Sequence, residues 1–324
     1  MRAIGVVVAA LSLCAAAGSA AAQAGYPEQA VRILVGFSAG VAPDVTARLM
    51  ADRLAEAWGK PVVVENVTGA AGNIAADRVA KAAPNGYTLG MIGNSSLIFS
   101  PSMYDKLSFD PVRDFAPISQ VFVAANVLVV PSDMPARSLP ELVALARAQP
   151  GKLTYAHAGA GTSQHLAAEL FKSMEHLDIR PVPYRGTTAL LPDLLAGRVS
   201  MSFGNIVNVL PLVREGKLRA FAVTSIKRSM TAPDLPTMAE SGYPGFEAVP
   251  WFGLMAQAGT SPAIIDKLHR DTVRILALPD VRRRLNHLGL DVIGGSPAEL
   301  AAVIEREIPQ WARVIRQAGI KASD

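Results

Sequence analysis

Residues 31–65 read VRILVGFSAGVAPDVTARLMADRLAEAWGKPVVVE. The apolar, β-branched run at 31–35 predicts a strand, and the similar run at 61–65 predicts a second one. Between them, residues 43–58 predict a helix, because Pro43 suits a first helical turn and apolar side chains recur at helical spacing. A strand, a helix and a strand in this order predict two parallel strands with the helix packed on their sheet.

The same alternation continues along the chain. A helix at 73–82 and a strand at 87–92 complete a βαβαβ run. Later helices at 139–148, 162–174 and 187–196 alternate with strands at 153–157, 180–184, 199–203 and 218–224. Three further helices, at 262–276, 281–288 and 297–317, have little strand between them. We therefore expect an α/β protein whose sheets are mostly parallel and carry helices on their faces.

Residues 1–22 have the layout of a secretory signal peptide. Arg2 precedes an uncharged apolar run at 4–17, and Ala20-Ala21-Ala22 fits a cleavage site before Gln23. The apolar run is shorter than the roughly 20 residues of a membrane span. Cys14 is the only cysteine, and Leu13 before it is a poor fit for lipidation. We expect export to the periplasm and a mature chain without a thiol, hence without a disulfide or thiolate metal site.

Charge says little about the partner. Removing residues 1–22 removes one arginine and no acid, so the formal charge of +4 falls to +3. A weakly basic exported protein suits a small anionic ligand, although net charge alone is weak evidence. The run Arg282-Arg283-Arg284 is typical of a solvated helix face. We find no signature of nucleic-acid binding and expect a monomer with no cofactor and no metal.

Two apolar, extended segments, at 118–130 and 246–256, are long enough to cross between domains. Two crossings imply a discontinuous first domain, formed by residues 23–124 and 248–324, and a second domain formed by residues 125–247. A ligand would then bind in the cleft between them, near the carboxyl ends of the strands.

Five turns rich in small residues follow predicted strands and precede helices, at 37–44, 68–73, 93–96, 159–165 and 184–188. Such turns offer free backbone N–H groups at a positive helix end, so they can bind a carboxylate without an arginine. The candidate ligand-binding residues are Phe37, Ser38, Ala39, Gly40, Val41, Asp44, Asn73, Asn94, Ser95, Ser96, Gly161, Thr162, Ser163, His165, Tyr184, Gly186, Thr187 and Asn205.

Other interpretations of these residues stay open. Thr162 or Ser163 could simply cap a helix, and Asp44 could pair with Arg48 four residues later. Ser163 beside His165 would suit a hydrolase, but no orienting acid accompanies the pair. The sequence has no G-x-S-x-G, GxxxxGK[ST] or HExxH motif. We therefore expect no catalytic residue.

Several stretches together resemble the periplasmic receptors of tripartite tricarboxylate transporters, also called the Bug receptor family. They are VRILVGFSAG at 31–40, GKPVVVENVTGAAGN at 59–73, PNGYTL at 84–89, GAGTSQHLAAELFK at 159–172, VPYRGTTALLPDLLAGRV at 182–199, GKLRAFAVTSIKRS at 216–229, APDLPTMAESGYPGFE at 232–247 and WFGLMAQAGTSP at 251–262. The resemblance implies a type II periplasmic-binding fold of two α/β domains that close over a small organic carboxylate. It also implies delivery to integral-membrane transporter subunits; a periplasmic sensor for a signalling partner is the alternative.

The first turn departs from the pattern of the family. Val41 stands where a second glycine is usual, and Pro43 stands where a hydroxyl residue is usual. Ala75 likewise replaces a further glycine. Pro43 supplies no N–H, and Val41 adds a stiff apolar wall. We therefore expect an aromatic acid, or an amide, to be an alternative ligand to a simple dicarboxylate.

Overall fold

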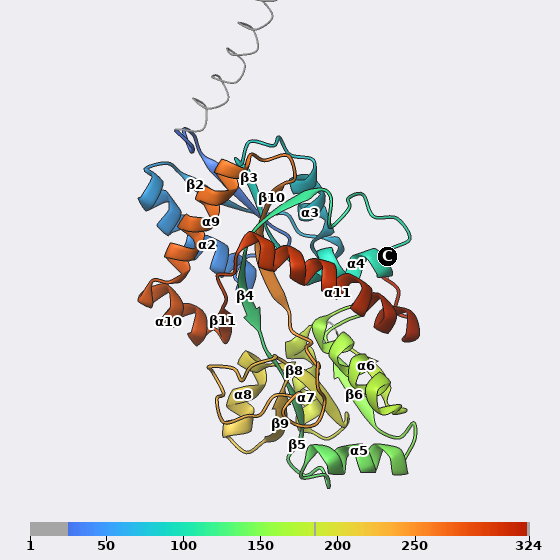
Figure 1. The fold of residues 1–324 in the computed structure, drawn as a ribbon. Coiled ribbons are helices and arrows are strands. Elements are labelled where there is room, and N and C mark those ends of the chain that lie inside the picture. Colours follow the sequence, from blue (N-terminus) through green and yellow to red (C-terminus); the bar gives the residue numbers. More distant parts are fainter. Residues whose placement is uncertain (1–24, 185, 323–324) are drawn as a thin grey trace, which may run out of the picture.

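The computed structural model describes residues 25–184 and 186–322. Within these ranges the chain forms two α/β units, each built on one sheet with helices on both faces (Figure 1). The predicted signal peptide at 1–22, with Cys14 and the cleavage position before Gln23, lies outside the described residues. In the described ranges, no helix is both long and apolar enough to cross a membrane.

The first sheet has six strands in the order β11-β4-β10-β3-β1-β2. They are β1 (Val31–Val35), β2 (Val62–Asn66), β3 (Thr88–Gly93), β4 (Phe115–Ala124), β10 (Trp251–Gln257) and β11 (Leu290–Val292). The first three match the predicted strands within one residue, which confirms the βαβαβ start.

Helices cover both faces of the first sheet. Val31, Ile33 and Val35 share a core with α2 (Ala42–Trp58), α9 (Pro262–Leu276) and α10 (Pro279–His287). Leu34 points the other way, into a core shared with α3 (Asn73–Ala80) and α11 (Pro297–Gln317). Successive side chains of a strand point to opposite faces of the sheet, so β1 contributes side chains to two hydrophobic cores.

The second sheet has five strands in the order β7-β6-β8-β5-β9. They are β5 (Asn126–Pro131), β6 (Thr154–His157), β7 (Arg180–Pro183), β8 (Met201–Asn205) and β9 (Leu218–Val223). One face packs on α5 (Leu139–Ala148) and α6 (Ser163–Glu175), and the other on α7 (Thr187–Leu195) and α8 (Ile206–Arg214). The short helix α8 was not predicted, and Pro211 lies inside it.

The prediction that the sheets are mostly parallel is wrong. Strand β1 is parallel to β2 and β3, and β6 is parallel to β7 and β8. The pairs β10–β3, β10–β4, β11–β4, β5–β8 and β5–β9 are antiparallel. Only strands joined by a crossover helix must be parallel. The crossings join β4 to β5 and β9 to β10, each pair in different sheets, and within the described ranges no crossover helix joins β4, β5 or β10 to a strand beside it.

Two extended paths connect the units. The segment predicted at 118–130 is two strands, β4 in the first sheet and β5 in the second, on either side of Ala125. The second path returns through residues 246–250 into β10. The two paths are tied together because the Ala124 N–H donates to the Pro250 carbonyl oxygen at 2.9 Å.

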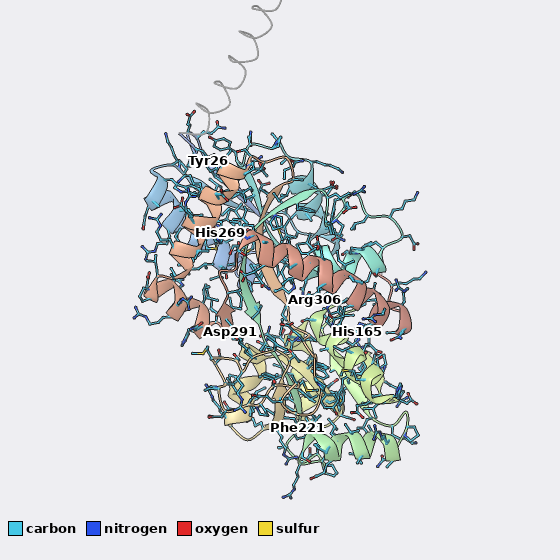
Figure 2. All side chains as sticks on the ribbon, in the orientation of Figure 1. Tyr26, His165, Phe221, His269, Asp291 and Arg306 are labelled. Atoms are coloured by element: carbon cyan, nitrogen blue, oxygen red, sulfur yellow. The ribbon has the colours of Figure 1, made fainter. Side chains whose placement is uncertain are left out.

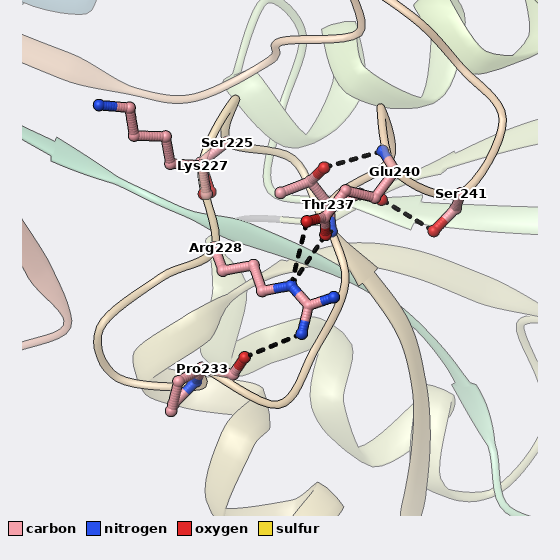
Figure 3. Close-up of polar contacts among 7 residues, drawn as sticks. All are labelled: Ser225, Lys227, Arg228, Pro233, Thr237, Glu240 and Ser241. Atoms are coloured by element: carbon pink, nitrogen blue, oxygen red, sulfur yellow. Dashed lines mark hydrogen bonds and ion pairs between the residues drawn. The ribbon is translucent and has the colours of Figure 1, made fainter.

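The second path, residues 224–250 between β9 and β10, is called the return path. It begins with an irregular segment at 224–248 that is held by its own polar contacts (Figure 3). Arg228 Nε donates to Glu240 Oε2 at 2.9 Å, and the Arg228 guanidinium also donates to the Pro233 carbonyl oxygen at 3.3 Å. The Glu240 N–H donates to Thr237 Oγ1 at 3.0 Å, and Ser241 Oγ donates to the Thr237 carbonyl oxygen at 2.8 Å. These contacts order a segment that has no helix or strand of its own.

Candidate functional site

The first turn, at 37–44, is organised by a buried carboxylate. Asp44 is 2% exposed and accepts hydrogen bonds from the Gly40 N–H at 2.8 Å, Arg48 Nε at 3.0 Å and Asn66 Nδ2 at 2.8 Å. Burial alone would raise the pKa of Asp44, but the bonds from Arg48, Gly40 and Asn66 outweigh it and lower that pKa. Asp44 therefore holds the turn, while Ser38, Ala39 and Gly40 are exposed.

The side chains around this turn are apolar. Val41 is 43% exposed and Ile74, at the start of α3, is 44% exposed. The half-buried Phe37 packs edge-on against Phe252 with ring centroids 5.4 Å apart, and Phe252 stacks on Phe122. Apolar side chains are thus exposed in the first turn, at Val41, and at the start of α3, at Ile74.

The second and third turns are bonded to each other. Ala70 and Ala71 have positive φ angles of 46° and 55°, a region that residues other than glycine seldom adopt. The Ala71 carbonyl oxygen accepts from Ser95 Oγ at 2.9 Å and from Ser96 Oγ at 3.3 Å. The two serine hydroxyls therefore stabilise a strained turn. The third turn continues into a π-helix at Ser95–Phe99 and then α4 (Ser100–Met103), neither of which was predicted.

Three predicted asparagines have different surroundings. Asn94 Nδ2 donates to the Val249 carbonyl oxygen of the return path at 2.8 Å. Asn205 caps α8, since its side chain accepts from the Val207 N–H at 3.1 Å. Asn73 is 7% exposed, and neither its Oδ1 nor its Nδ2 has a partner among the described residues. Asn94 thus ties the third turn to the return path, whereas Asn205 stabilises the start of α8 in its own unit.

The fourth turn, at 159–165, rests on two stacked histidines. Thr162 caps α6, and its hydroxyl donates to the Gly159 carbonyl oxygen at 2.8 Å. His165 Nδ1 accepts from the Gly161 N–H at 3.3 Å, and its ring stacks on His157 with centroids 4.1 Å apart. His165 is 8% exposed and lies at the end of α6 nearest the first unit (Figure 2). Its bond to the Gly161 N–H and its stacking on His157 thus stabilise the turn.

The fifth turn is held by an amide that the sequence did not single out. Gln164 Nε2 donates to Thr187 Oγ1 at 3.1 Å, and Gln164 Oε1 accepts from the Ala158 N–H at 3.0 Å. The Gly186 N–H donates to the Ala158 carbonyl oxygen at 3.3 Å. Tyr184 faces its own unit, since its hydroxyl donates to Asp193 Oδ2 at 2.7 Å. Burial and then Asp193 raise the pKa of Tyr184 to about 12.

Turns from both units line one cavity of about 280 Å³. The second and third turns contribute Ala70, Ala71 and Ser95, and the fourth contributes Ala160 and Gly161. A larger groove of about 790 Å³ lies elsewhere on the first unit, between the β1–β3 strands and α3. Its charges pair with one another, as in the Arg78–Glu65 and Arg32–Glu65 contacts. Residues of the second, third and fourth turns thus line the smaller cavity, whereas its lining, among the described residues, includes no residue of the first or fifth turn.

Comparison with known proteins gives the family. Residues 46–320 match the Tripartite tricarboxylate transporter family receptor, TctC. BugT of Bordetella pertussis is 37% identical over 297 residues, which cover 91% of this chain and 91% of BugT. The chain belongs to the TctC receptor family. The resemblance drawn from the sequence is thereby confirmed.

Solved structures agree with this assignment. Rhodopseudomonas palustris Rpa4515 with adipate is 35% identical to the receptor, with a TM-score of 0.76, and the match covers 91% of this chain and 99% of that one. MatC from the same species, with bound malate, is 34% identical, with a TM-score of 0.72, covering 90% of this chain and 100% of MatC. The expected two-domain α/β fold is confirmed. Members of the family are periplasmic solute-binding receptors rather than enzymes.

The two residues of the hydrolase alternative have other partners in the receptor. Ser163 Oγ accepts from Asn126 Nδ2 at 3.1 Å, and His165 Nδ1 accepts from Gly161. Within residues 25–184 and 186–322 no hydrogen bond joins Ser163 to His165. Each residue of the pair is thus bonded to another partner in its own unit or crossing.

Sequence reasoning missed three buried or half-buried amides that position the turns, namely Asn66, Asn126 and Gln164. Asn66 ends β2 just before the second turn and Gln164 lies within the fourth turn, whereas Asn126 is the first residue of β5 and lies beside none of the five turns. Their partners are 6 to 122 residues away along the chain, as in the bonds from Gln164 to Ala158 and from Asn126 to Ala248. Position at a small-residue turn was therefore the only signal available for Asn66 and Gln164, and Asn126 had no such signal.

The buried histidines should make the receptor sensitive to acid. Burial, and then the charges of His157 and Lys172, lower the pKa of His165 to about 3, whereas an unfolded histidine titrates near pH 6.5. The unfolded chain therefore binds this proton first, so stability is complete above about pH 6.5 and is lost as the pH falls toward 3. We expect the free energy of unfolding to fall by up to about 1.4 kcal/mol per pH unit from this residue.

Urea unfolding at several pH values measures this slope. His165→Asn keeps an acceptor near Nδ1 but removes the titration, so its stability should depend less on pH between 6.5 and 4. The matched control is His176→Asn, a change in an exposed histidine at the other end of α6, in the left-handed conformation that asparagine tolerates. Identical slopes in the wild type and His165→Asn would contradict the prediction.

Proposed function

We propose that the receptor captures a small organic carboxylate in the periplasm and delivers it to the integral-membrane subunits of a tripartite tricarboxylate transporter. The two domains would be residues 23–124 with 248–324 and residues 125–247, closing on the ligand through the two crossings. The main support is the cavity between the units that turns of both line. Family membership and the relatives solved with adipate and malate also support it.

The proposed ligand lies with its charged end on the second domain. Helix α6 begins at the turn that carries Gly161, Thr162 and Ser163. Helix α7 begins at the turn that carries Gly186 and Thr187. Helix N-termini favour an anion through free N–H groups and the helix dipole. On the first domain, Phe37 and Val41 would receive an apolar or aromatic part, or a neutral amide. We assign Asp44, Asn94, Ser95, Ser96, His165, Tyr184 and Asn205 to support of the turns.

The proposal includes export. Residues 1–22 would be removed, and the mature protein would act as a monomer without a cofactor or nucleic acid. Intact-mass measurement and light scattering on protein released from the periplasm test this together. A retained N-terminus, or a stable dimer at low concentration, would contradict it.

A thermal-shift screen over small carboxylates and their amides tests the function. A ligand at a hundredfold excess over its dissociation constant stabilises the folded state by about 2.7 kcal/mol, so a true ligand raises the melting temperature. The same ligand should make the particle more compact in solution scattering. A panel that includes adipate, malate and aromatic acids and shifts neither quantity would refute the proposal.

A further inference from the structure

Asn126 occupies the place where the two crossings meet the second unit. It is the first residue of β5, one residue beyond Ala125, and is 1% exposed. Its N–H donates to Thr224 Oγ1 at 3.1 Å, and its carbonyl oxygen accepts from the Thr224 N–H at 2.9 Å. These bonds to Thr224, the residue after β9, fix the backbone of Asn126 and therefore the origin of its side chain.

The orientation of the Asn126 amide follows from its neighbours. Nδ2 is 3.1 Å from Ser163 Oγ and 3.4 Å from the Ala248 carbonyl oxygen on the return path. A carbonyl oxygen can only accept, so turning the amide over would place two oxygens against each other. Nδ2 therefore faces Ala248 and Ser163. The opposite atom, Oδ1, is buried and has no hydrogen-bond partner among the described residues.

This orientation decides what Ser163 can offer. A hydroxyl has one proton to donate, and it accepts through its lone pairs. Ser163 Oγ already accepts from Asn126, and within the described ranges it donates to no other residue. Ser163 is half-buried at the first position of α6, in the turn that faces the other unit. Its proton is thus left available to a ligand.

We propose that Asn126 is a positioning residue that makes Ser163 a hydrogen-bond donor to the bound ligand and links this contact to both crossings. The inference rests on the proposed function. The ligand must present an acceptor at Ser163, such as a carboxylate oxygen, because an N–H group there would meet a donor. The same Asn126 amide contacts Ala248, so a ligand held by Ser163 is connected to the return path as well.

Asn126→Asp, measured at a pH where its carboxylate is ionised, tests the proposal because it keeps the shape but cannot donate. The Ser163 proton would then turn toward residue 126 and leave lone pairs for the ligand. Calorimetry with adipate and adipamide, and with malate and malamide, measures the preference for the acid over the amide. We expect this preference to fall by at least about tenfold, the effect of one hydrogen bond to a charged group. A role in folding alone would change acid and amide affinities equally.

A control separates orientation from added charge. Asn126→Asp made in a Ser163→Ala background measures the charge alone. It should change the preference by less than about threefold, because no donor is reoriented. A change equal to that of Asn126→Asp alone would overturn the proposal.

Ser163→Ala alone keeps the test available if Asn126→Asp does not fold. Removing a donor should weaken the acids by about tenfold or more and the amides by less than about threefold. Equal losses, or a greater loss for the amides, would overturn the inference while leaving the proposed function intact. A wild-type receptor that binds none of these acids would instead overturn both.

Discussion

Replacing Trp251 with alanine is expected to lower the free energy of unfolding by about 3–5 kcal/mol, the usual cost of removing a large buried aromatic side chain. Trp251 is 1% exposed and starts β10, directly after the return path. Its Nε1 donates to Glu307 Oε2 of α11 at 2.9 Å. The change would therefore leave a cavity and a buried carboxylate without its donor.

The charge state of Glu307 adds to this effect. Burial raises the pKa of Glu307 to about 7, with the Trp251 bond opposing the rise and the Glu247 charge assisting it. A raised carboxyl pKa means that this group stabilises the fold fully below about pH 4.5 and less as the pH rises through 7. Without Trp251 the penalty at neutral pH should grow, so the loss should be larger at pH 8 than at pH 5.

Urea unfolding at the two pH values measures both effects. Trp58→Ala is the matched control, since the half-buried Trp58 also donates through Nε1 to a carboxylate, Asp271, at 2.7 Å. Trp58 lies away from the crossings, and its removal should cost less. A loss below about 1.5 kcal/mol for Trp251→Ala, less than any ordinary large-to-small core change of this kind, would show that the residue is not a central part of the fold.

Restoring a polar first turn should change which ligand the receptor prefers. The double change Val41→Gly with Pro43→Thr removes an exposed apolar wall and adds a hydroxyl and an N–H at the start of α2. Each new hydrogen bond to a carboxylate is worth about 1.5–3 kcal/mol. We therefore expect the variant to bind adipate about 10- to 100-fold more tightly relative to benzoate than the wild type does.

Calorimetry with the two acids measures this ratio. Val63→Thr, a change in an exposed valine of β2 outside the turns, should leave both affinities unaltered. If waters already complete the wild-type site, an ordinary dicarboxylate binds there and the double variant gains little. An unchanged ratio would therefore refute the idea that Val41 receives an apolar part of the ligand.

Short-range pattern was sufficient for most elements. The helices α5 and α11 have the predicted bounds, with Ser138 and Ser296 as their caps. The strand β1 is also exact, because four of its five residues are apolar and three of those are β-branched, a composition that favours a strand. By contrast, α8 and the π-helix after Asn94 were missed, since short elements are stabilised mainly by the contacts around them.

For the candidate site, too, local sequence determined some features and left others open. The amino-acid sequence by itself determined that five small-residue turns follow strands, which family the chain resembles, and that Val41 and Pro43 make the first turn unusual. It did not determine where the polar atoms of those turns point. The Asp44 carboxylate accepts hydrogen bonds from Gly40, Arg48 and Asn66. Ser95 and Ser96 both donate to the Ala71 carbonyl oxygen.

Only the tertiary structure decided these partners and the directions of the central strands. Asn94 bonds to Val249 and Asn126 to Ala248, across 155 and 122 residues. A hydrogen bond depends on where two atoms lie in space, within about 3 Å of each other, and a local pattern carries no information on a segment so far along the chain. Strand direction depends likewise on the path that brings β10 back from the second unit to lie between β3 and β4.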